Sequence, residues 1–97
     1  MILVEKIYRP GHEPITSVDQ IAKFQTNDGY ITPYHVLARE IGADKENCFY
    51  KNSEGKRKKV VATKDAAGTW QLKTIGSTDA TTDGLLSLPR MLNNWGD

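Results

Sequence analysis

The sequence predicts an α+β fold: a curled sheet of five to six mostly antiparallel strands, or a small barrel, with one short helix and a C-terminal leucine clasp. Short β-branched and aromatic segments alternate with glycine-containing turns, one segment has the apolar spacing of a helix, and leucines follow a polar spacer near the C-terminus. With 97 residues the chain has room for one core. We therefore expect a single domain over 1–97, with its core in 1–91 and a flexible or docking tail over 92–97.

Strand-like composition recurs along the chain. The predicted strands are residues 2–8, 15–25, 30–32, 48–52, 57–64 and 69–75. Apolar residues in the second of these segments do not alternate strictly, so a bulge near Asp19 and Gln20 is needed to keep one face apolar. Short connections that end in glycine join the last three segments, which predicts an antiparallel meander.

The last predicted strand has the clearest alternation. Trp70, Leu72 and Thr74 point to one face, and Gln71 and Lys73 point to the other. This period of two is typical of a strand that is buried on one side only. We expect the face with Trp70 to be the buried one.

One helix is predicted between the third and fourth strands. Thr32 is placed to cap it, Pro33 suits its first position, and Gly42 suits its end. Its apolar face is formed by Tyr34, Leu37, Ala38 and Ile41. A helix of about nine residues is not stable alone in water, so we expect it to pack against the sheet.

Leu85, Leu86 and Leu88 follow a polar stretch and are the residues of the predicted clasp. We expect them to bury against the open face of the meander, each contributing roughly 1.5–3 kcal/mol to the stability of the fold. Ser87 is placed to cap a short terminal helix. The apolar positions of that helix would be Leu88, Met91, Leu92 and Trp95.

Three segments of the chain resemble a known bacterial family. The segments are Trp70–Thr74, Asp83–Pro89 and, less specifically, Gly11–Val18. Together they resemble the family catalogued as domain of unknown function 3892, although Lys73 stands where the family usually has arginine and Gly84 where it usually has asparagine. The resemblance implies a bacterial, cytoplasmic, accessory protein, and it brings no established activity.

Composition excludes several classes of protein. Thirteen Lys and Arg residues against twelve Asp and Glu give a net charge of +1, so no overall attraction to nucleic acid or anionic lipid is expected. No apolar run approaches the roughly 20 residues that span a membrane. A single cysteine excludes an internal disulfide framework and is consistent with a reducing cytoplasm.

The sequence favours no catalytic or metal site. Cys48 has His12 and His35 as possible partners but no nucleophile motif around it, so we expect a small buried hydrophobe. The nearest approach to a metal site is His12 and Glu13 with Asp19, whose spacing does not match a metal-binding motif. We predict no catalytic residue, no metal and no cofactor, and an enzyme is disfavoured.

A basic segment is the strongest functional feature. Its cations are Lys51, Lys56, Arg57, Lys58, Lys59 and Lys64. Four of them are consecutive at a hairpin, as in phosphate-contacting patches, and Phe49 and Tyr50 add stacking surface. Strand alternation sends Lys56 and Lys58 to the face opposite Arg57 and Lys59. A solubilising hairpin, an edge protected by lysines and an acidic protein partner are the alternatives.

These features predict a non-catalytic binding domain, with nucleic acid as the favoured partner. The alternative is a protein-interaction module, such as an inhibitor, an immunity protein or a phage- or mobile-element-encoded antagonist. Trp95, near the chain end, is the expected interface residue in that case, and we expect it to be partly exposed. A small hydrolytic enzyme is the third possibility.

Overall fold

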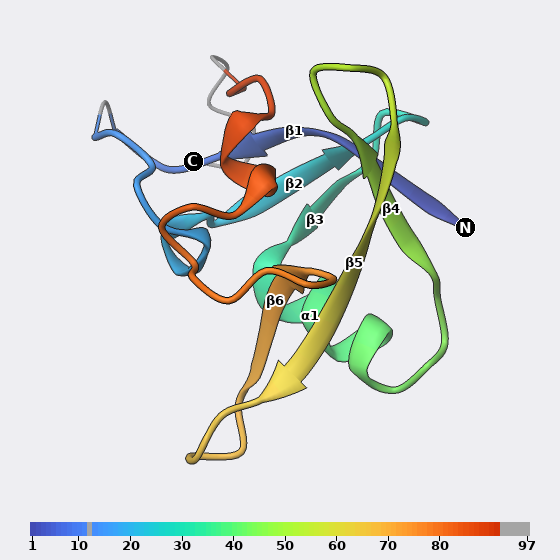
Figure 1. Cartoon of the computed structure of the whole chain (residues 1–97), viewed down its shortest axis with the longest axis vertical. Coiled ribbons are helices and arrows are strands. Elements are labelled where there is room, and N and C mark those ends of the chain that lie inside the picture. The colour runs from blue at the N-terminus through green and yellow to red at the C-terminus, as the bar shows by residue number, and fades with distance from the viewer. Residues whose placement is uncertain (12, 92–97) are drawn as a thin grey trace.

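The computed structural model describes residues 1–11 and 13–91, and within this part six strands form one sheet in the order β3-β2-β1-β4-β5-β6 (Figure 1). The strands are β1 (Ile2–Tyr8), β2 (Lys23–Thr26), β3 (Ile31–Pro33), β4 (Cys48–Lys51), β5 (Arg57–Lys64) and β6 (Trp70–Thr74). The helical elements are α1 (Tyr34–Gly42) and two 3-10 helices, η1 (Val18–Gln20) and η2 (Gly84–Ser87).

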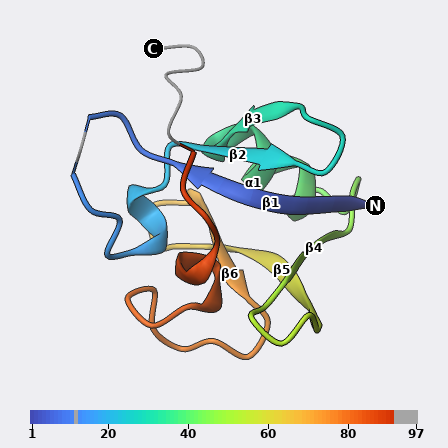
Figure 2. The same ribbon diagram turned by 90° about the horizontal axis from the view of Figure 1, so that it is seen from above.

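The sheet is mixed but mostly antiparallel. Among the six strands of the described residues, β1 and β4 at the centre pair in parallel, and the other four strand pairings are antiparallel. Figure 2 shows the resulting curl, with β1, β2 and β3 on one side of the molecule and β5 and β6 on the other. The predicted α+β class, with a mostly antiparallel sheet and one α-helix, is therefore confirmed for the described residues.

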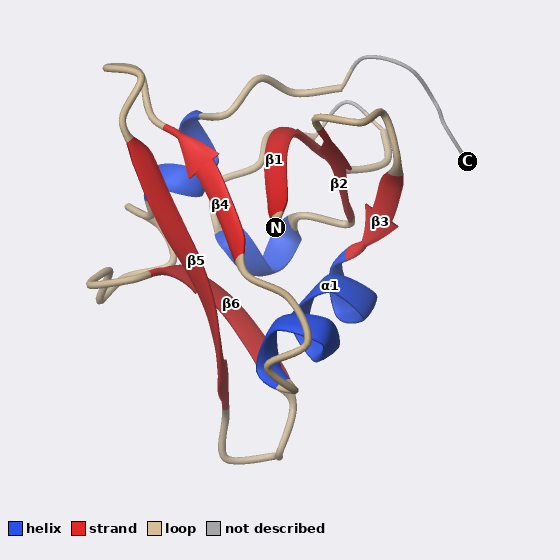
Figure 3. Cartoon of the chain, turned by 90° about the vertical axis from the view of Figure 1, so that its right-hand side faces the viewer, coloured by secondary structure: helices blue, strands red, loops and turns tan. Residues whose placement is uncertain are grey.

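The small-barrel alternative is wrong, because the sheet stays open between β3 and β6. Helix α1 packs against both of these edge strands and lies between them in Figure 3. The hydroxyl of Tyr34, the first helical residue, accepts a hydrogen bond from the backbone N–H of Leu72 at 2.8 Å. Helix α1 and the Tyr34 side chain thus occupy the place where β3 and β6 would have to pair to close a barrel. The Tyr34 hydroxyl also gives a backbone N–H at the edge of β6 a hydrogen-bond partner.

The predicted strand over 15–25 is only partly formed. Residues 18–20 of this segment form the 3-10 helix η1, which buries Val18, and strand β2 begins only at Lys23. The spacing of three residues between Val18, Ile21 and Phe24 suits a helical turn that leads into a strand, and all three side chains are buried. No bulge forms near Asp19. The register shift lies in β1 instead, between Val4 and Lys6.

Helix α1 has the predicted position but not the predicted caps. Pro33 is the last residue of β3 and precedes the helix, and no side chain caps the first turn. Gly42 is the last helical residue, and the positive φ that ends the helix belongs to Asp44, at 61°. Gly42 is needed for space, because a Cβ atom there would overlap with the indole ring of Trp70. Trp70 itself is half-buried on β6.

The predicted terminal helix does not form over the described residues. Leu88 is extended, and the segment that follows runs beside β1. There the backbone N–H of Ile7 donates to the carbonyl of Pro89 at 3.0 Å, and the N–H of Met91 donates to the carbonyl of Ile7 at 2.8 Å. The other two residues proposed for that helix, 92 and 95, lie outside the described residues.

The core fills the inner side of the curled sheet. It consists of Val4, Ile7, Val18, Ile21, Phe24, Leu37, Ala38, Cys48, Tyr50, Val60, Leu72, Leu85 and Leu88. Leu85 is fully buried, Leu88 is 9% exposed, and Leu86 packs against the cluster from outside. The leucines of the predicted clasp therefore contact the core, and their contribution to stability stays a prediction.

Candidate nucleic-acid interface

The register of β4, β5 and β6 decides which basic side chains share a face. Cys48, Tyr50 and Val60 are buried on the inner side of the sheet, so the residues that alternate with them point outward. On this outer side Lys51 pairs with Arg57. Phe49 pairs with Lys59, and Val61 pairs with Lys73 on β6. We call Lys51, Arg57, Lys59 and Lys73, together with Phe49, the outer basic face.

Of the two rings expected to add stacking surface, Phe49 lies on the outer basic face, but the expectation for Tyr50 is wrong, because its side chain is buried on the inner face. The guanidinium carbon of Arg57 is 5.5 Å from the centroid of the Phe49 ring, which is a cation–π contact. The same guanidinium donates to the sulfur of Met1 at 3.6 Å. A planar cation stacked on a half-buried ring is a surface on which a nucleobase can stack.

The cations of the outer basic face lack acidic partners in the described part of the chain. The ion pairs found there join the N-terminal amine to Glu46, Arg9 to Glu13, and Lys56 to Glu54. Lys51, Arg57 and Lys59 are exposed, and Lys73 is half-buried. Their charged groups are therefore available to bind an anion. They lose water only when that anion binds.

The six predicted cations do not form one patch. Lys51, Arg57 and Lys59 share the outer basic face, whereas Lys58 lies on the inner face beside Tyr50. The other two cations, Lys56 and Lys64, are also elsewhere. Lys56 precedes β5 and pairs with Glu54 at 3.7 Å, so its predicted place on a strand face is wrong. The ammonium of Lys64 lies over the indole ring of Trp70, 4.9 Å from the ring centroid.

Lys73 is the residue that the predicted patch missed. It is distant from the basic segment in sequence and reaches the outer basic face only through the pairing of β6 with β5. The signal was present in the alternation of 69–75, which predicts Lys73 on the face opposite Trp70. What the sequence does not give is the register that sets Lys73 opposite Val61.

A buried polar network lies on the inner side of the same strands. The carboxylate of Asp83, which is 3% exposed, accepts the backbone N–H of Thr74 at 2.8 Å and that of Leu85 at 2.9 Å. It also accepts the hydroxyl of Thr74 at 2.5 Å. Because that hydroxyl already donates its one hydrogen to Asp83, the hydroxyl of Tyr50 is the donor in its 2.8 Å contact with Thr74.

This network fastens the segment before the leucines to the sheet. Asp83 joins β6 to the first turn of η2, and a Cβ atom at Gly84 would overlap with the hydroxyl of Tyr50. Burial raises the pKa of the Tyr50 phenol, which keeps it protonated as a donor. The arrangement offers no free base or nucleophile, so its role is structural.

Among the other reactive side chains, Cys48 is part of the core. Cys48 is fully buried, and burial raises the pKa of its thiol to about 12, which leaves it without thiolate character at neutral pH. His35 is exposed on α1, and His12 lies outside the described residues. Within residues 1–11 and 13–91, no group of three or more His, Cys, Asp and Glu side chains is placed to hold a metal ion.

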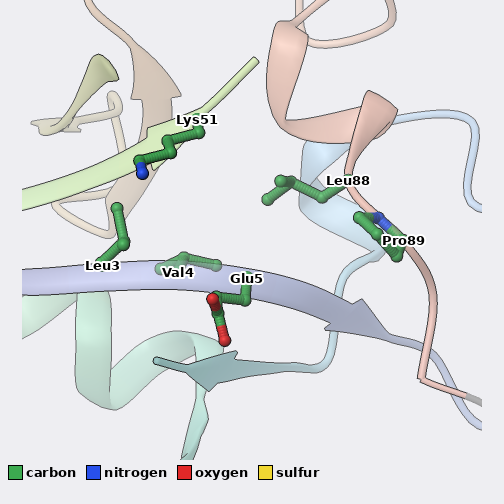
Figure 4. A pocket seen from close by; sticks show the side chains of 6 residues that line it. All are labelled: Leu3, Val4, Glu5, Lys51, Leu88 and Pro89. Atoms are coloured by element: carbon green, nitrogen blue, oxygen red, sulfur yellow. The ribbon is translucent and has the colours of Figure 1, made fainter. Parts of the chain in front are cut away.

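A small notch adjoins the outer basic face at the end of β4. It has a volume of about 170 Å³, and Figure 4 shows Leu3 and Lys51 on one side of it and Leu88 and Pro89 on the other. The notch lies between two segments that pair with different parts of β1. Strand β4 pairs with β1 as far as Val4, and the C-terminal segment contacts β1 further along, at Ile7. Small-molecule sites are typically 300–1,000 Å³, so this notch alone is too small to be one.

No protein-family model, curated protein or solved structure matches this chain. The resemblance to domain of unknown function 3892 therefore stays a prediction. In the described ranges no helix has the length and apolar composition needed to cross a membrane. The function has to be argued from the geometry of the faces of the sheet.

Proposed function

We propose that this domain binds single-stranded nucleic acid on the outer basic face. The observation that carries the proposal is the alternation of β4, β5 and β6, which sets Lys51, Arg57, Lys59 and Lys73 around Phe49. None of the four cations has an acidic partner among the described residues. We place the protein in the cytoplasm, where a lone cysteine stays reduced.

The chemistry of the face suits a flexible polyanion. The cations attract phosphates without reading sequence, and counterion release makes such binding dependent on salt. The Arg57–Phe49 pair offers a stacking surface that every base can use. In a duplex the bases are stacked on each other, so this surface favours an unpaired strand.

A second candidate is an acidic protein partner, as for an inhibitor, an immunity protein or a phage- or mobile-element-encoded antagonist. Exposed apolar side chains support it, because Ile75 at the end of β6 is 59% exposed and Met1 beside Arg57 is 69% exposed. Interfaces between proteins combine apolar contacts with charge complementarity. Trp95, the interface residue expected for this candidate, lies outside the described residues.

Two triple variants with equal charge separate a defined face from a general basic surface. The face variant carries Lys51→Gln, Arg57→Gln and Lys59→Gln, and the control variant carries Lys56→Gln, Lys58→Gln and Lys64→Gln. Each variant lowers the net charge by three, but only the first removes charge from the outer basic face. Binding is measured by fluorescence anisotropy over a salt series, with labelled single-stranded and duplex oligonucleotides that carry no terminal phosphate.

We expect the native chain to prefer the single strand, with affinity that falls as salt rises at a log–log slope of about −2 to −4, for three or four phosphate contacts. The face variant should lose this binding, and the control variant should retain most of it. Equal losses in both variants would show attraction to overall charge, which contradicts a site on this face. If no oligonucleotide binds at low salt, the nucleic-acid proposal fails and the acidic protein partner becomes the favoured function.

A further inference from the structure

A polar hollow lies on the other side of β5 from the outer basic face. It has a volume of about 460 Å³ and lies between the β4–β5 hairpin and the chain segment that follows β6. Tyr50 and Thr74 contribute to its lining, and both belong to the buried network described above. The hollow therefore has a rigid base, held by side chains whose hydrogen bonds are already made.

We propose that this hollow binds a phosphate monoester. Three groups around it can donate hydrogen bonds to an anion: the ammonium of Lys58, the amide of Asn52 and the hydroxyl of Thr78. The side-chain oxygen of Asn52 accepts the backbone N–H groups of Glu54 at 3.0 Å and Lys56 at 2.9 Å. Its NH₂ group is therefore left to donate.

The charge around the hollow is one-sided. No Asp or Glu lines it, and Lys58 forms no ion pair within the described part of the chain. The nearest carboxylate of the network, that of Asp83, is buried and is occupied by Thr74 and Leu85. A lysine with several neutral donors is a suitable partner for a phosphate, which presents three strong acceptor oxygens.

The size of the hollow points to a phosphate that carries an organic group. Inorganic phosphate is much smaller than 460 Å³, and the hollow is open to solvent, so an organic group attached to the phosphate has room to extend along it. Such a phosphate belongs either to a free small molecule or to the end of a nucleic-acid strand. Both sources present the same phosphate monoester to Lys58, and the experiment below distinguishes them.

Neighbouring lysines on opposite faces of β5 provide a matched pair of variants. Lys58→Gln removes the charge at the hollow, and Lys59→Gln removes one from the outer basic face, so each changes the net charge equally. Adenosine 5′-monophosphate, adenosine and inorganic phosphate are titrated into the ¹⁵N-labelled full chain. Amide shifts of residues 76–78 report binding at the hollow.

We expect the monophosphate to give saturable shifts at residues 76–78, and adenosine to bind at least about tenfold more weakly, because a charge-assisted hydrogen bond contributes 1.4 kcal/mol or more. Lys58→Gln should weaken binding of the monophosphate by about the same factor, and Lys59→Gln should leave that binding unchanged. Thr78→Val, at an exposed position, should also weaken it. The absence of saturable shifts, or equal effects of the two lysine variants, would overturn the proposal.

Paired oligonucleotides with a 5′-phosphate or a 5′-hydroxyl then identify the source. If the phosphorylated strand binds more tightly and Lys58→Gln abolishes this difference, the hollow binds the end of a strand. Equal binding of both strands, with the monophosphate still bound, assigns it to a free phosphorylated small molecule. The site does not rest on the outer basic face, so failure of oligonucleotide binding would end the proposed function and leave this inference standing.

Discussion

The inner and outer faces of β4, β5 and β6 use polar groups in opposite ways. On the inner face, Asp83, Thr74 and Tyr50 form a buried network in which the three side chains satisfy one another. On the outer face, Lys51 and Lys59 are exposed and have no acidic partner among the described residues. Adjacent residues of one strand therefore belong to different environments.

This difference separates stability from binding along a single strand. A buried hydrogen-bonded group is costly to remove because its partners are left without water or a substitute. An exposed charge contributes little to folding, since solvent screens it in both the folded and unfolded states. Changes on the inner face should therefore alter the free energy of unfolding, and changes on the outer face should alter binding.

Removal of the chain after Gly84 should have the largest effect. It deletes the buried Leu85 and Leu88 together with Met91, whose backbone pairs with Ile7. Loss of two or three buried side chains should lower the free energy of unfolding by several kcal/mol, because each contributes roughly 1.5–3 kcal/mol. Urea unfolding of the truncated and full chains checks this, and equal midpoints would show that the leucines do not act as a clasp.

Asp83→Ala should be the next most damaging change. It leaves the backbone N–H groups of Thr74 and Leu85 buried without an acceptor. At about 1–3 kcal/mol for each unsatisfied group, the loss should be about 3 kcal/mol or more. Asp83→Asn, which keeps one carbonyl acceptor, is the matched control and should cost less. A loss below about 1 kcal/mol for Asp83→Ala would show that water replaces the carboxylate and that the network does not fasten η2.

Local sequence patterns predicted an element correctly where the spacing of its apolar residues fits one kind of secondary structure. Strands β1 and β5 begin and end at the predicted residues. The failures come from patterns with two structural solutions. Apolar residues three apart at Val18 and Ile21 suit either a bulged strand or a 3-10 turn, and the same spacing at Leu88 and Met91 suggested a helix where Pro89 lies in an extended segment beside β1.

The candidate site was predictable only within each strand. Alternation correctly separated Lys58 from Arg57 and Lys59, since it is a local property of the chain. The placement of Lys73 near them depends on cross-strand register, and the role of Asp83 depends on the approach of Thr74 nine residues away. Neither relation leaves a periodic pattern in the sequence.

Alkaline pH provides a smaller test on the inner face. Burial raises the pKa of the Cys48 thiol from its ordinary value of 9.0 to about 12 in the folded chain. The buried neutral thiol therefore contributes its full share of stability below pH 9, and this share is lost as the pH rises from 9 towards 12. The loss is about 1.4 kcal/mol for each pH unit.

Cys48→Ala isolates that contribution, because burial also raises the pKa values of Tyr34 and Tyr50, which act in the same direction above pH 10. Between pH 7 and pH 10 the native chain should lose about 1.4 kcal/mol more than the variant does. Urea unfolding at both pH values measures the difference. Identical pH dependence in the two chains would mean that the thiol is not protected from solvent in the folded state.

The smallest effect on stability should come from the outer basic face. A variant that carries Lys51→Gln, Arg57→Gln, Lys59→Gln and Lys73→Gln removes exposed or half-exposed charges and the Arg57–Phe49 contact. An exposed cation–π contact contributes about 0.5–1 kcal/mol, and each of the other three surface substitutions should stay within about 0.5 kcal/mol, so the total loss should remain below about 2.5 kcal/mol. The same variant should abolish oligonucleotide binding if the proposed function is right. A loss of several kcal/mol would show that this face helps to hold the sheet together, and the separation of stability from binding across β5 would then be wrong.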